Sequence, residues 1–600
     1  MSLVPPTVPP TVAPSVAAQD RRSRAGRWAP WLVIACYLLA AIALTWRLWA
    51  DPASREQSGD VHDIDLFAWF LRYTATAVSH GHLPALVTTA LNAPQGVNLM
   101  WNTSVLLPGI VLTPVTLLAG PQVSLTVLLT LGYAGSAASL FFAARQWGAS
   151  LGAAALGGAV YGFSPALIAS GFGHYHLQFA VLPPLIIHAL LRIVTGRARP
   201  VWGVVRTGAW LGLLTSAQLF TGEELLLDTA VAGLVLVVVL AASHPSAVAG
   251  RARWSAFGIL AGVVVMLVIC GHALSVQFFG PFTERGRPLT PITGSLVPFV
   301  TPPGELLLHT RASAAAAGHH ASEYLGYLGW PLLVVLVAAA IRFWPDLRAR
   351  AAAVTWAVLE LLSLGGKPLR IGGLHYPGWL LPWHWVQGLP GMAEVLPDRF
   401  ALLADAAAAV LLAFSLDLAR ARVPQARGWR RRGVVAAAVL AVVPLIPLPF
   451  AVSPVAGVPA GWQAAFARLH LAPDDRVLVL PPPAQFHTLA MRWQATTGEP
   501  GTLVAGYFLG PGPDRQSTFS PGPILPTSDA LKQLVLEPPH VAVRQSASIA
   551  LIRSDLAYWR PAAIIAVPGL GSPSLPVLTV LFGKPTFRIG QVLAWRYRAS

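Results

Sequence analysis

Charged residues are scarce in this 600-residue chain, and their scarcity excludes a soluble globular protein. Asp, Glu, Lys and Arg together make up 11% of the sequence, whereas a typical soluble domain carries about a quarter. Hydrophobic residues make up 55%, and the mean hydropathy is +0.60. The composition therefore predicts an integral membrane protein, with the lipid bilayer as its solvent.

Cysteine is nearly absent. The only two, Cys36 and Cys270, each lie inside an apolar run, so the sequence offers neither a disulfide framework nor a thiolate metal site. Acidic residues are also few: 25 Asp and Glu stand against 41 Lys and Arg, which gives a net charge of +16. The positive charge comes almost wholly from arginines in short loops between apolar stretches. This pattern is a signal of membrane topology, and we expect no nucleic-acid partner.

The topology depends on residues 104–120, a short apolar segment that contains Pro108 and Pro114. If this segment crosses the bilayer, the later arginine-rich loops fall outside, against the rule that cytoplasmic loops carry the Lys and Arg excess. We therefore predict that it is interfacial or re-entrant, which gives about eleven crossings with the N-terminus inside and the C-terminus outside. The predicted spans are 31–49, 121–143, 150–171, 176–194, 203–221, 224–243, 256–278, 324–343, 351–366, 400–419 and 433–452.

Three parts follow from this topology: a disordered cytoplasmic tail (1–28), a transmembrane domain (29–453) and an extra-cytoplasmic α/β domain (454–600). The transmembrane domain includes a first outer loop, 51–120, with interfacial helices. In the last part, short β-branched runs bounded by Pro and charge, at 475–481 and 562–567, predict strands. Residues 528–536 predict a helix. We expect the protein in the plasma membrane as a multi-pass protein, with any chemistry on its outer face.

The first outer loop contains three aspartates within six residues, Asp60, Asp63 and Asp65, followed by a helix-like amphipathic stretch. A carboxylate at the bilayer surface is partly desolvated, which raises its pKa and suits it to take a proton from an acceptor hydroxyl. The three aspartates are therefore candidate catalytic residues, with His62 as a neighbouring substrate-binding candidate. The alternative is structural: Asp63 or Asp65 caps the following helix.

Two further outer turns carry candidate substrate-binding residues. Glu223 and Glu224 lie where two predicted spans meet, and ionisable groups there are costly unless they face a cavity, a partner or water. They either bind a sugar or a cation, or simply reach the interface. His174 and His176 flank a tyrosine on the same side and, with Asp63 or Glu223, could form a divalent-cation site. Turn histidines are more often unliganded, so we predict no metal ligand and leave a divalent cation open.

Arginines on the outer face suggest an anionic ligand, and a lipid phosphate is the obvious one at this depth. Arg285 and Arg287 lie in the loop 279–323, which ends at Glu323, a further substrate-binding candidate. Arg399 lies at the mouth of a predicted span. Its alternative role is structural, because the adjacent Asp398 can pair with it or cap the helix.

These features together resemble the GT-C superfamily of polytopic glycosyltransferases, which use polyprenyl-phosphate sugars. The resemblance rests on the acidic first outer loop, the interfacial helices at 66–79 and 104–118, the short basic inner loops and the extra-cytoplasmic domain. It covers most of the chain. An actinobacterial-type branch is indicated by the stretches Pro94–Leu99, Gly222–Leu226, Glu323–Gly326, Met491–Ala495 and Leu581–Pro585.

The resemblance implies a hexosyl- or pentosyltransferase in which an acidic residue of the first outer loop acts as base and basic residues hold the donor phosphate. The expected partners are a polyprenyl-phosphate sugar, the bilayer, and a glycan, lipid or protein acceptor. The extra-cytoplasmic α/β domain (454–600), which we call the tail domain, is expected to hold the acceptor or a partner protein. Its Trp559 and Trp595 are expected to be exposed aromatic residues. Two alternatives remain: a lipid or glycan translocator, and a non-catalytic assembly protein of the cell envelope.

Overall fold

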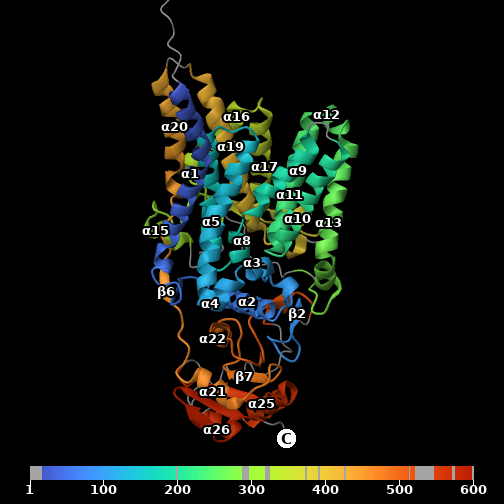
Figure 1. Ribbon diagram of the computed structural model, residues 1–600, viewed down its shortest axis with the longest axis vertical. Coiled ribbons are helices and arrows are strands. Elements are labelled where there is room, and N and C mark those ends of the chain that lie inside the picture. The colour runs from blue at the N-terminus through green and yellow to red at the C-terminus, as the bar shows by residue number, and fades with distance from the viewer. Residues whose placement is uncertain are drawn as a thin grey trace, which may run out of the picture.

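A helical bundle with a small mixed domain at one end makes up the computed structural model (Figure 1). The structure describes residues 16–196, 200–284, 286, 296–317, 325–371, 374–389, 392–424, 427–512, 514–520, 546–569 and 575–597. The predicted helix at 528–536 lies outside these residues.

The bundle consists of long, roughly parallel helices with a common axis (Figure 1). They are α1 (Val16–Trp49), α5 (Pro121–Gln146), α6 (Leu151–Gly162) with α7 (Pro165–Ser170), α9 (Leu182–Thr195), α10 (Val201–Leu219), α11 (Glu223–Ser243), α13 (Ala252–Phe279), α16 (Trp330–Arg342), α17 (Leu347–Ser363), α19 (Ala401–Arg422) and α20 (Gly428–Val442). The short elements between them are α8 (Tyr175–Gln178), α12 (Pro245–Ala249), α14 (Val297–Val300), α15 (Arg311–Ala317), η3 (Gly378–Leu380), α18 (Pro382–Val386), η4 (Met392–Glu394), η5 (Pro397–Phe400) and η6 (Val443–Leu445).

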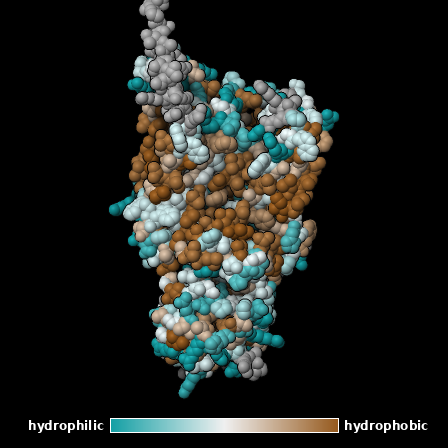
Figure 2. All heavy atoms as spheres, in the orientation of Figure 1, coloured by the Kyte–Doolittle hydropathy of each residue, from teal (hydrophilic) through white to brown (hydrophobic). Residues whose placement is uncertain are grey.

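The length and composition of these helices confirm a polytopic membrane protein. Six helical stretches of the described chain are long and apolar enough to cross a bilayer, and Figure 2 shows the matching apolar band between two more hydrophilic ends. The six are Trp28–Trp49, Pro121–Gln146, Leu151–Ser170, Glu223–Ser243, Ala252–Phe279 and Pro397–Arg422. Two shorter apolar helices, α9 and α16, accompany them. The number of eleven crossings stays a prediction.

The segment 104–120 forms two short helices, α3 (Leu106–Val111) and α4 (Thr113–Ala119), of 6 and 7 residues. At 1.5 Å per residue each is about 10 Å long, so neither can cross a hydrocarbon core of about 30 Å. Both pack against α2 (Val61–Ser79), at the end of the bundle nearest the tail domain (Figure 1). The prediction that this segment does not cross the membrane agrees with these lengths.

The two ends of the bundle differ in charge. At one end lie the last turns of α9, α16 and α19 and the first turns of α13, α17 and α20, and each of these turns carries at least one arginine (Figure 1). We call this the arginine end. At the other end, which we call the domain end, α2, α3 and α4 face the tail domain (Figure 1). The acidic first loop and the tail domain therefore share one end.

Helices α10 and α13 approach each other closely through two glycine pairs. Gly208 and Gly212 of α10 face the backbone oxygens of Gly258 and Gly262 of α13, and a Cβ atom at either α10 position would overlap those oxygens. Such small-residue spacing lets helices pack without a hydrophobic driving force in lipid. The packing of this pair therefore depends on the absence of side chains.

Replacing Gly212 by alanine should lower the thermal stability of the protein, at a cost of about 1–3 kcal/mol for overpacking. The matched control is Gly271→Ala in α13, where a Cβ would meet nothing within 4 Å. Alanine favours a helix over glycine, so the control should be neutral or stabilising. Melting curves in nanodiscs measure both, and equal melting temperatures for the two variants would contradict the close approach.

The tail domain contains a five-stranded mixed sheet in the order β12-β13-β11-β7-β8. Strand β11 (Ala563–Ala566) pairs with β7 (Arg476–Leu480) in parallel and with β13 (Val592–Arg596) in antiparallel orientation, and both predicted strands are confirmed. The remaining elements are β8 (Thr502–Leu503), β12 (Phe587–Ile589), α21 (Trp462–Leu469), α22 (Leu489–Thr497), α25 (Ser546–Trp559) and α26 (Leu575–Phe582).

One expectation about this domain is wrong. Trp559 and Trp595 are 5% and 3% exposed, because they pack into the core cluster with Leu478, Ile552 and Leu578. They are structural residues of the sheet and its covering helices, and they do not offer a binding surface.

Short two-stranded ladders form outside the five-stranded sheet. Of these, β1 (Arg55–Gln57) pairs with β6 (Val452–Pro454) and so joins the first outer loop to the segment that enters the tail domain. The others are β2 (Val87–Thr88) with β3 (Val97–Asn98), followed by η1 (Leu99–Trp101), β4 (Leu369–Ile371) with β5 (Leu374–Tyr376), and β9 (Leu509–Pro511) with β10 (Ser517–Phe519).

Candidate active site

Asp63 lies in the first turn of α2, where the helix dipole favours a negative charge. The amphipathic helix buries one face, including Ile64 and Phe67, and leaves the Asp63 side chain 20% exposed at the edge of that face. Asp60 precedes the helix, and its side chain makes no capping hydrogen bond. Asp63 therefore has the half-buried position that the sequence predicts for a candidate base.

His174 lies opposite Asp63 in the turn between α7 and α8. Its Nε2 atom is 3.4 Å from Asp63 Oδ2. The approach depends on Gly173, whose φ is +143° and whose missing Cβ would lie 3.2 Å from the Cβ atoms of both Asp60 and Asp63. A side chain at this position would push the turn away. The structure thus brings together two residues that the sequence places in separate outer loops.

The tail domain supplies the second partner of Asp63. The Tyr507 hydroxyl donates a hydrogen bond of 2.6 Å to Asp63 Oδ1. Burial raises the pKa of Tyr507 well above its ordinary value, and the charge of Asp63 raises it further. The phenol therefore stays protonated and acts as a donor at neutral pH. Sequence reasoning missed Tyr507, because 444 positions separate it from Asp63.

An aromatic wall, formed by His62, Phe486, Tyr507 and Phe519, borders Asp63. The His62 and Phe486 rings meet edge to face with their centroids 5.0 Å apart, and the Tyr507 and Phe519 rings stack with their centroids 5.7 Å apart. Phe486 is 67% exposed and has a φ of +71°, so it gains little from burial and adopts a backbone conformation that costs free energy in a residue with a side chain. A strained and exposed phenylalanine that contacts His62, the residue next to Asp63 in the chain, is typical of a ligand-binding surface.

Asp65 has a different environment from Asp63. It is 1% exposed, pairs with the Arg492 Nε atom, and accepts a 2.5 Å hydrogen bond from the Thr488 hydroxyl. Arg492 also contacts Glu56 at 2.5 Å and Gln122 Oε1 at 2.6 Å. We call these five residues the Arg492 cluster. Burial raises the pKa of Glu56 to about 7, an effect that the positive charge of Arg492 opposes.

The Arg492 cluster fixes the tail domain to the bundle. It joins the first outer loop, the first turn of α5 and helix α22 of the tail domain. Beside it, Trp69 donates to Gln494 at 3.0 Å, and Arg72 donates to the Ala495 carbonyl at 2.6 Å. Helix α2 is thereby held against α22, which sets the position of Tyr507 relative to Asp63.

A second polar group lies at the start of α11. Glu224 Oε2 is 3.8 Å from the Arg399 guanidinium, and Glu224 Oε1 accepts the Leu396 N–H at 3.0 Å. Both side chains are almost fully buried, so Glu224 does not simply reach the interface. Asp228, one turn further along α11, is fully buried, and its carboxylate has no hydrogen-bond partner within the described ranges. The turn at Glu223 therefore leads into a buried acidic region with one arginine.

This second group adjoins the first through α8. A Cβ at Gly222 would lie 3.1 Å from His176, whose ring stacks on Phe67 of α2 at 5.6 Å. His174 and His176 are neighbours, with ring centroids 5.9 Å apart. Within the part of the chain that the structure describes, three or more His, Cys, Asp or Glu side chains nowhere gather into a metal-binding group. Arg285, Arg287 and Glu323 lie outside the described residues.

No protein-family model and no curated protein matches the chain. Among solved structures, it is similar to the arabinofuranosyltransferase AftD from Mycobacteria, with a TM-score of 0.51 and 15% identity. The match covers 96% of this chain, and the chain spans 40% of the length of AftD. This likeness confirms the predicted GT-C-like fold.

Two further similar structures have TM-scores of 0.45. One is ArnT from Cupriavidus metallidurans bound to undecaprenyl phosphate, at 14% identity over 94% of this chain and 97% of ArnT. The other is the oligosaccharyltransferase AglB from Archaeoglobus fulgidus in complex with an inhibitory peptide and a dolichol-phosphate, at 9% identity over 90% of this chain and 69% of AglB.

Proposed function

We propose that the protein is a membrane glycosyltransferase that moves a sugar from a polyprenyl-phosphate carrier to an acceptor hydroxyl, with Asp63 as general base. The observation that carries the proposal is the partly exposed Asp63 carboxylate, held by Tyr507 and His174 where the bundle meets the tail domain. The fold that the chain shares with AftD supports the same class of reaction.

The reaction is a single displacement. Asp63 accepts the proton of the acceptor hydroxyl, the freed oxygen forms a bond to the anomeric carbon, and the bond from that carbon to the carrier phosphate breaks. Polyprenyl phosphate leaves with the electron pair, and the anomeric configuration inverts. Tyr507 and His174 orient the carboxylate, which still has lone pairs free for the acceptor proton. Asp65 is engaged with Arg492 and Thr488, so Asp63 is the better candidate.

The proposed orientation puts the arginine end in the cytoplasm and Asp63 outside. Positive loops on one side of a polytopic protein favour that side as cytoplasmic. Cysteines introduced at Gly428 and Gly433, on either side of the arginines that begin α20, test this orientation. An impermeant thiol reagent should leave both unlabelled in intact cells and label both after lysis. Labelling in intact cells would overturn the orientation and the proposal with it.

Donor and acceptor would meet at Asp63 from opposite directions. The lipid-linked sugar would come from the membrane side, where the pair of Glu224 and Arg399 lies at the start of α11, next to Gly222 and its neighbour His176. The acceptor would come from the side of the tail domain, along the aromatic wall, because flat aromatic faces suit the apolar faces of sugar rings. The acceptor is therefore proposed to be a glycan.

The direct test is a transfer assay with the full chain in proteoliposomes. Each member of a panel of polyprenyl-phosphate pentoses and hexoses is incubated with an oligosaccharide acceptor, and release of polyprenyl phosphate is followed with formation of the longer glycan. One donor should be consumed with inversion at the anomeric carbon. Parallel reactions with and without a chelator test the divalent cation. If no donor of the panel is consumed, the proposal fails.

Replacing Phe486 by alanine should raise the acceptor KM by roughly 2- to 10-fold, with little change in kcat, because an aromatic contact contributes about 0.5–1.5 kcal/mol. The matched control is Tyr558→Ala, which removes a 37% exposed aromatic ring from α25 of the same domain. Initial rates at varied acceptor concentration measure both. Equal KM values for the two variants would remove Phe486 from the acceptor site.

A further inference from the structure

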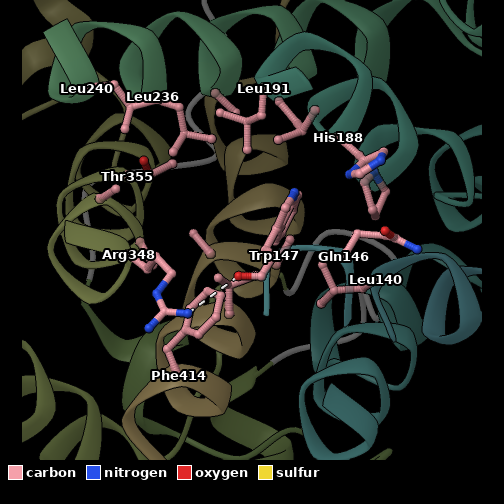
Figure 3. Close-up of a pocket in the computed structure, with 18 of the residues that line it drawn as sticks. Leu140, Gln146, Trp147, His188, Leu191, Leu236, Leu240, Arg348, Thr355 and Phe414 are labelled. Atoms are coloured by element: carbon pink, nitrogen blue, oxygen red, sulfur yellow. Dashed lines mark hydrogen bonds between the residues drawn. The ribbon is translucent and has the colours of Figure 1, made fainter. Parts of the chain in front are cut away.

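A cavity of about 400 Å³ lies inside the bundle, in the half that includes the arginine end. Helices α5, α9, α11, α17 and α19 surround it, and Figure 3 shows their side chains around an empty centre. Its inner lining is buried and apolar, with Ile187, Ala351 and Leu403 as examples. We call it the arginine-end cavity.

The exposed members of the lining mark its opening. Gln146, Arg192, Thr195 and Arg348 all line the cavity and are exposed, and all lie at the ends of α5 and α9 or the start of α17. These helix ends belong to the arginine end (Figure 1). The cavity therefore opens toward the arginine end, away from Asp63.

The opening carries donors for an anion. The Arg348 guanidinium lies 4.8 Å from the centre of the Phe414 ring and donates a 3.5 Å hydrogen bond to the Trp147 carbonyl. Figure 3 shows these three residues side by side at the cavity. Arg348 also lies 3.5 Å from the Asp346 carboxylate. Arg192 adds a second exposed guanidinium to the lining at the same end of the cavity. Two arginines beside one carboxylate leave a net positive charge at the opening, which suits a phosphate.

The depth of the cavity matches one leaflet. Its lining on α9 extends from Pro183 to Thr195, about 18 Å at 1.5 Å per residue, whereas half of a bilayer core measures about 15 Å. A single acyl chain fits this length. Because lipid tails are as apolar as leucine, the apolar lining cannot distinguish one phospholipid from another. A preference for one phospholipid over another must therefore come from the charge of its headgroup.

We propose that the arginine-end cavity binds one acyl chain of an anionic phospholipid, with the lipid phosphate against Arg348 and Arg192. The site is separate from the proposed donor and acceptor sites at the domain end. It does not depend on the proposed function, because its evidence lies wholly in the cavity and its opening.

The test uses the full chain in phosphatidylcholine nanodiscs, titrated with phosphatidylglycerol and measured by native mass spectrometry. The wild type should hold one phosphatidylglycerol with about tenfold preference over phosphatidylcholine. The double variant R192Q/R348Q should lose that preference. The matched control R430Q removes an arginine of the arginine end that lies over Trp429 on α20, outside the cavity lining, and should keep it. An unchanged preference in the double variant overturns the proposal.

A second measurement needs no variant. Phosphatidylglycerol with a photoreactive group near the end of one acyl chain should cross-link to residues at the deep end of the cavity, such as Pro183, Ala232 and Leu403. Cross-links confined to helix faces outside the cavity would overturn the proposal. So would preferential labelling of these residues by a photoreactive polyprenyl phosphate, which would make the cavity part of the donor site.

Discussion

Replacing Asp63 by asparagine should lower the rate of sugar transfer by about 10²- to 10⁴-fold, the usual contribution of a positioned general base. Asparagine keeps the shape of the side chain and can still accept the Tyr507 hydrogen bond at its amide oxygen. It cannot take the acceptor proton. The fold should therefore survive, and kcat should fall more than donor affinity changes. Initial rates in proteoliposomes measure the effect.

Two controls separate a base from a structural residue. Tyr507→Phe removes the donor to Asp63 and keeps the carboxylate, so its effect on kcat should be far smaller than that of Asp63→Asn. The Asp63→Asn protein should keep the wild-type melting temperature within a few degrees. If Asp63→Asn retains at least half of the wild-type rate, Asp63 is not the base, and Asp60 becomes the next candidate.

Sequence patterns predicted the parts of the fold that depend on local composition. The length of the apolar segments and the arginine-rich loops between them predicted the helical bundle, and the β-branched runs predicted strands β7 and β11. The two prolines of 104–120 and the charge argument together predicted a segment that does not cross, and the short helices α3 and α4 have lengths that agree with that prediction. The bundle and the two strands could be predicted because span length and strand propensity depend on neighbouring residues.

The site could be predicted only in part, because its geometry depends on distant pairs. The sequence indicated Asp63 and His174 and put them together only as possible ligands of a divalent cation, and nothing local pairs either of them with Tyr507. Nothing in the sequence pointed to Phe486, because the two features that single it out, its positive φ angle and its exposed side chain, are visible only in the structure. Trp559 was expected at the surface because aromatic residues in a small outer domain can bind glycans. Its side chain instead packs in the hydrophobic core between the sheet and its covering helices.

Arg492 shows the same limit most clearly. The stretch Met491–Ala495 stood out in the sequence, but its role did not. Arg492 is 1% exposed and contacts Asp65 and Glu56, both from the start of the first outer loop, and Gln122 from the first turn of α5. Partners 370 to 436 positions away cannot be inferred from spacing. A charged residue in a segment that otherwise reads as a surface helix was the only available signal.

Replacing Arg492 by alanine should destabilise the junction between bundle and tail domain by about 3–5 kcal/mol, because it leaves the buried Asp65 and Glu56 without their cation. Limited proteolysis in nanodiscs should release the tail domain faster. Transfer should also fall, since α22 no longer fixes α2 and the Tyr507 contact loosens. The matched control is Arg476→Ala, which loses one hydrogen bond to the Trp559 carbonyl and should cost about 1 kcal/mol.

The pH dependence of the Arg492→Ala variant distinguishes lost charge pairing from lost packing. Burial raises the pKa of Glu56 in the folded protein to about 7, above its ordinary value of 4.5, so the folded state binds a proton that the unfolded state releases. Stability therefore falls as the pH rises from 4.5 toward the folded pKa, by about 1.4 kcal/mol per unit. Without Arg492 this pKa rises further, so the variant should keep losing stability above pH 7.

Neutralising the two acids completes the test of the Arg492 cluster. In the triple variant Arg492→Met, Glu56→Gln and Asp65→Asn, no buried charge remains, so most of the lost stability should return and the pH dependence above pH 7 should disappear. Activity should recover with it, because Asp63 is untouched. If the triple variant is as unstable as Arg492→Ala at every pH, the side chains act through their shape, and the ionic account of the junction is wrong.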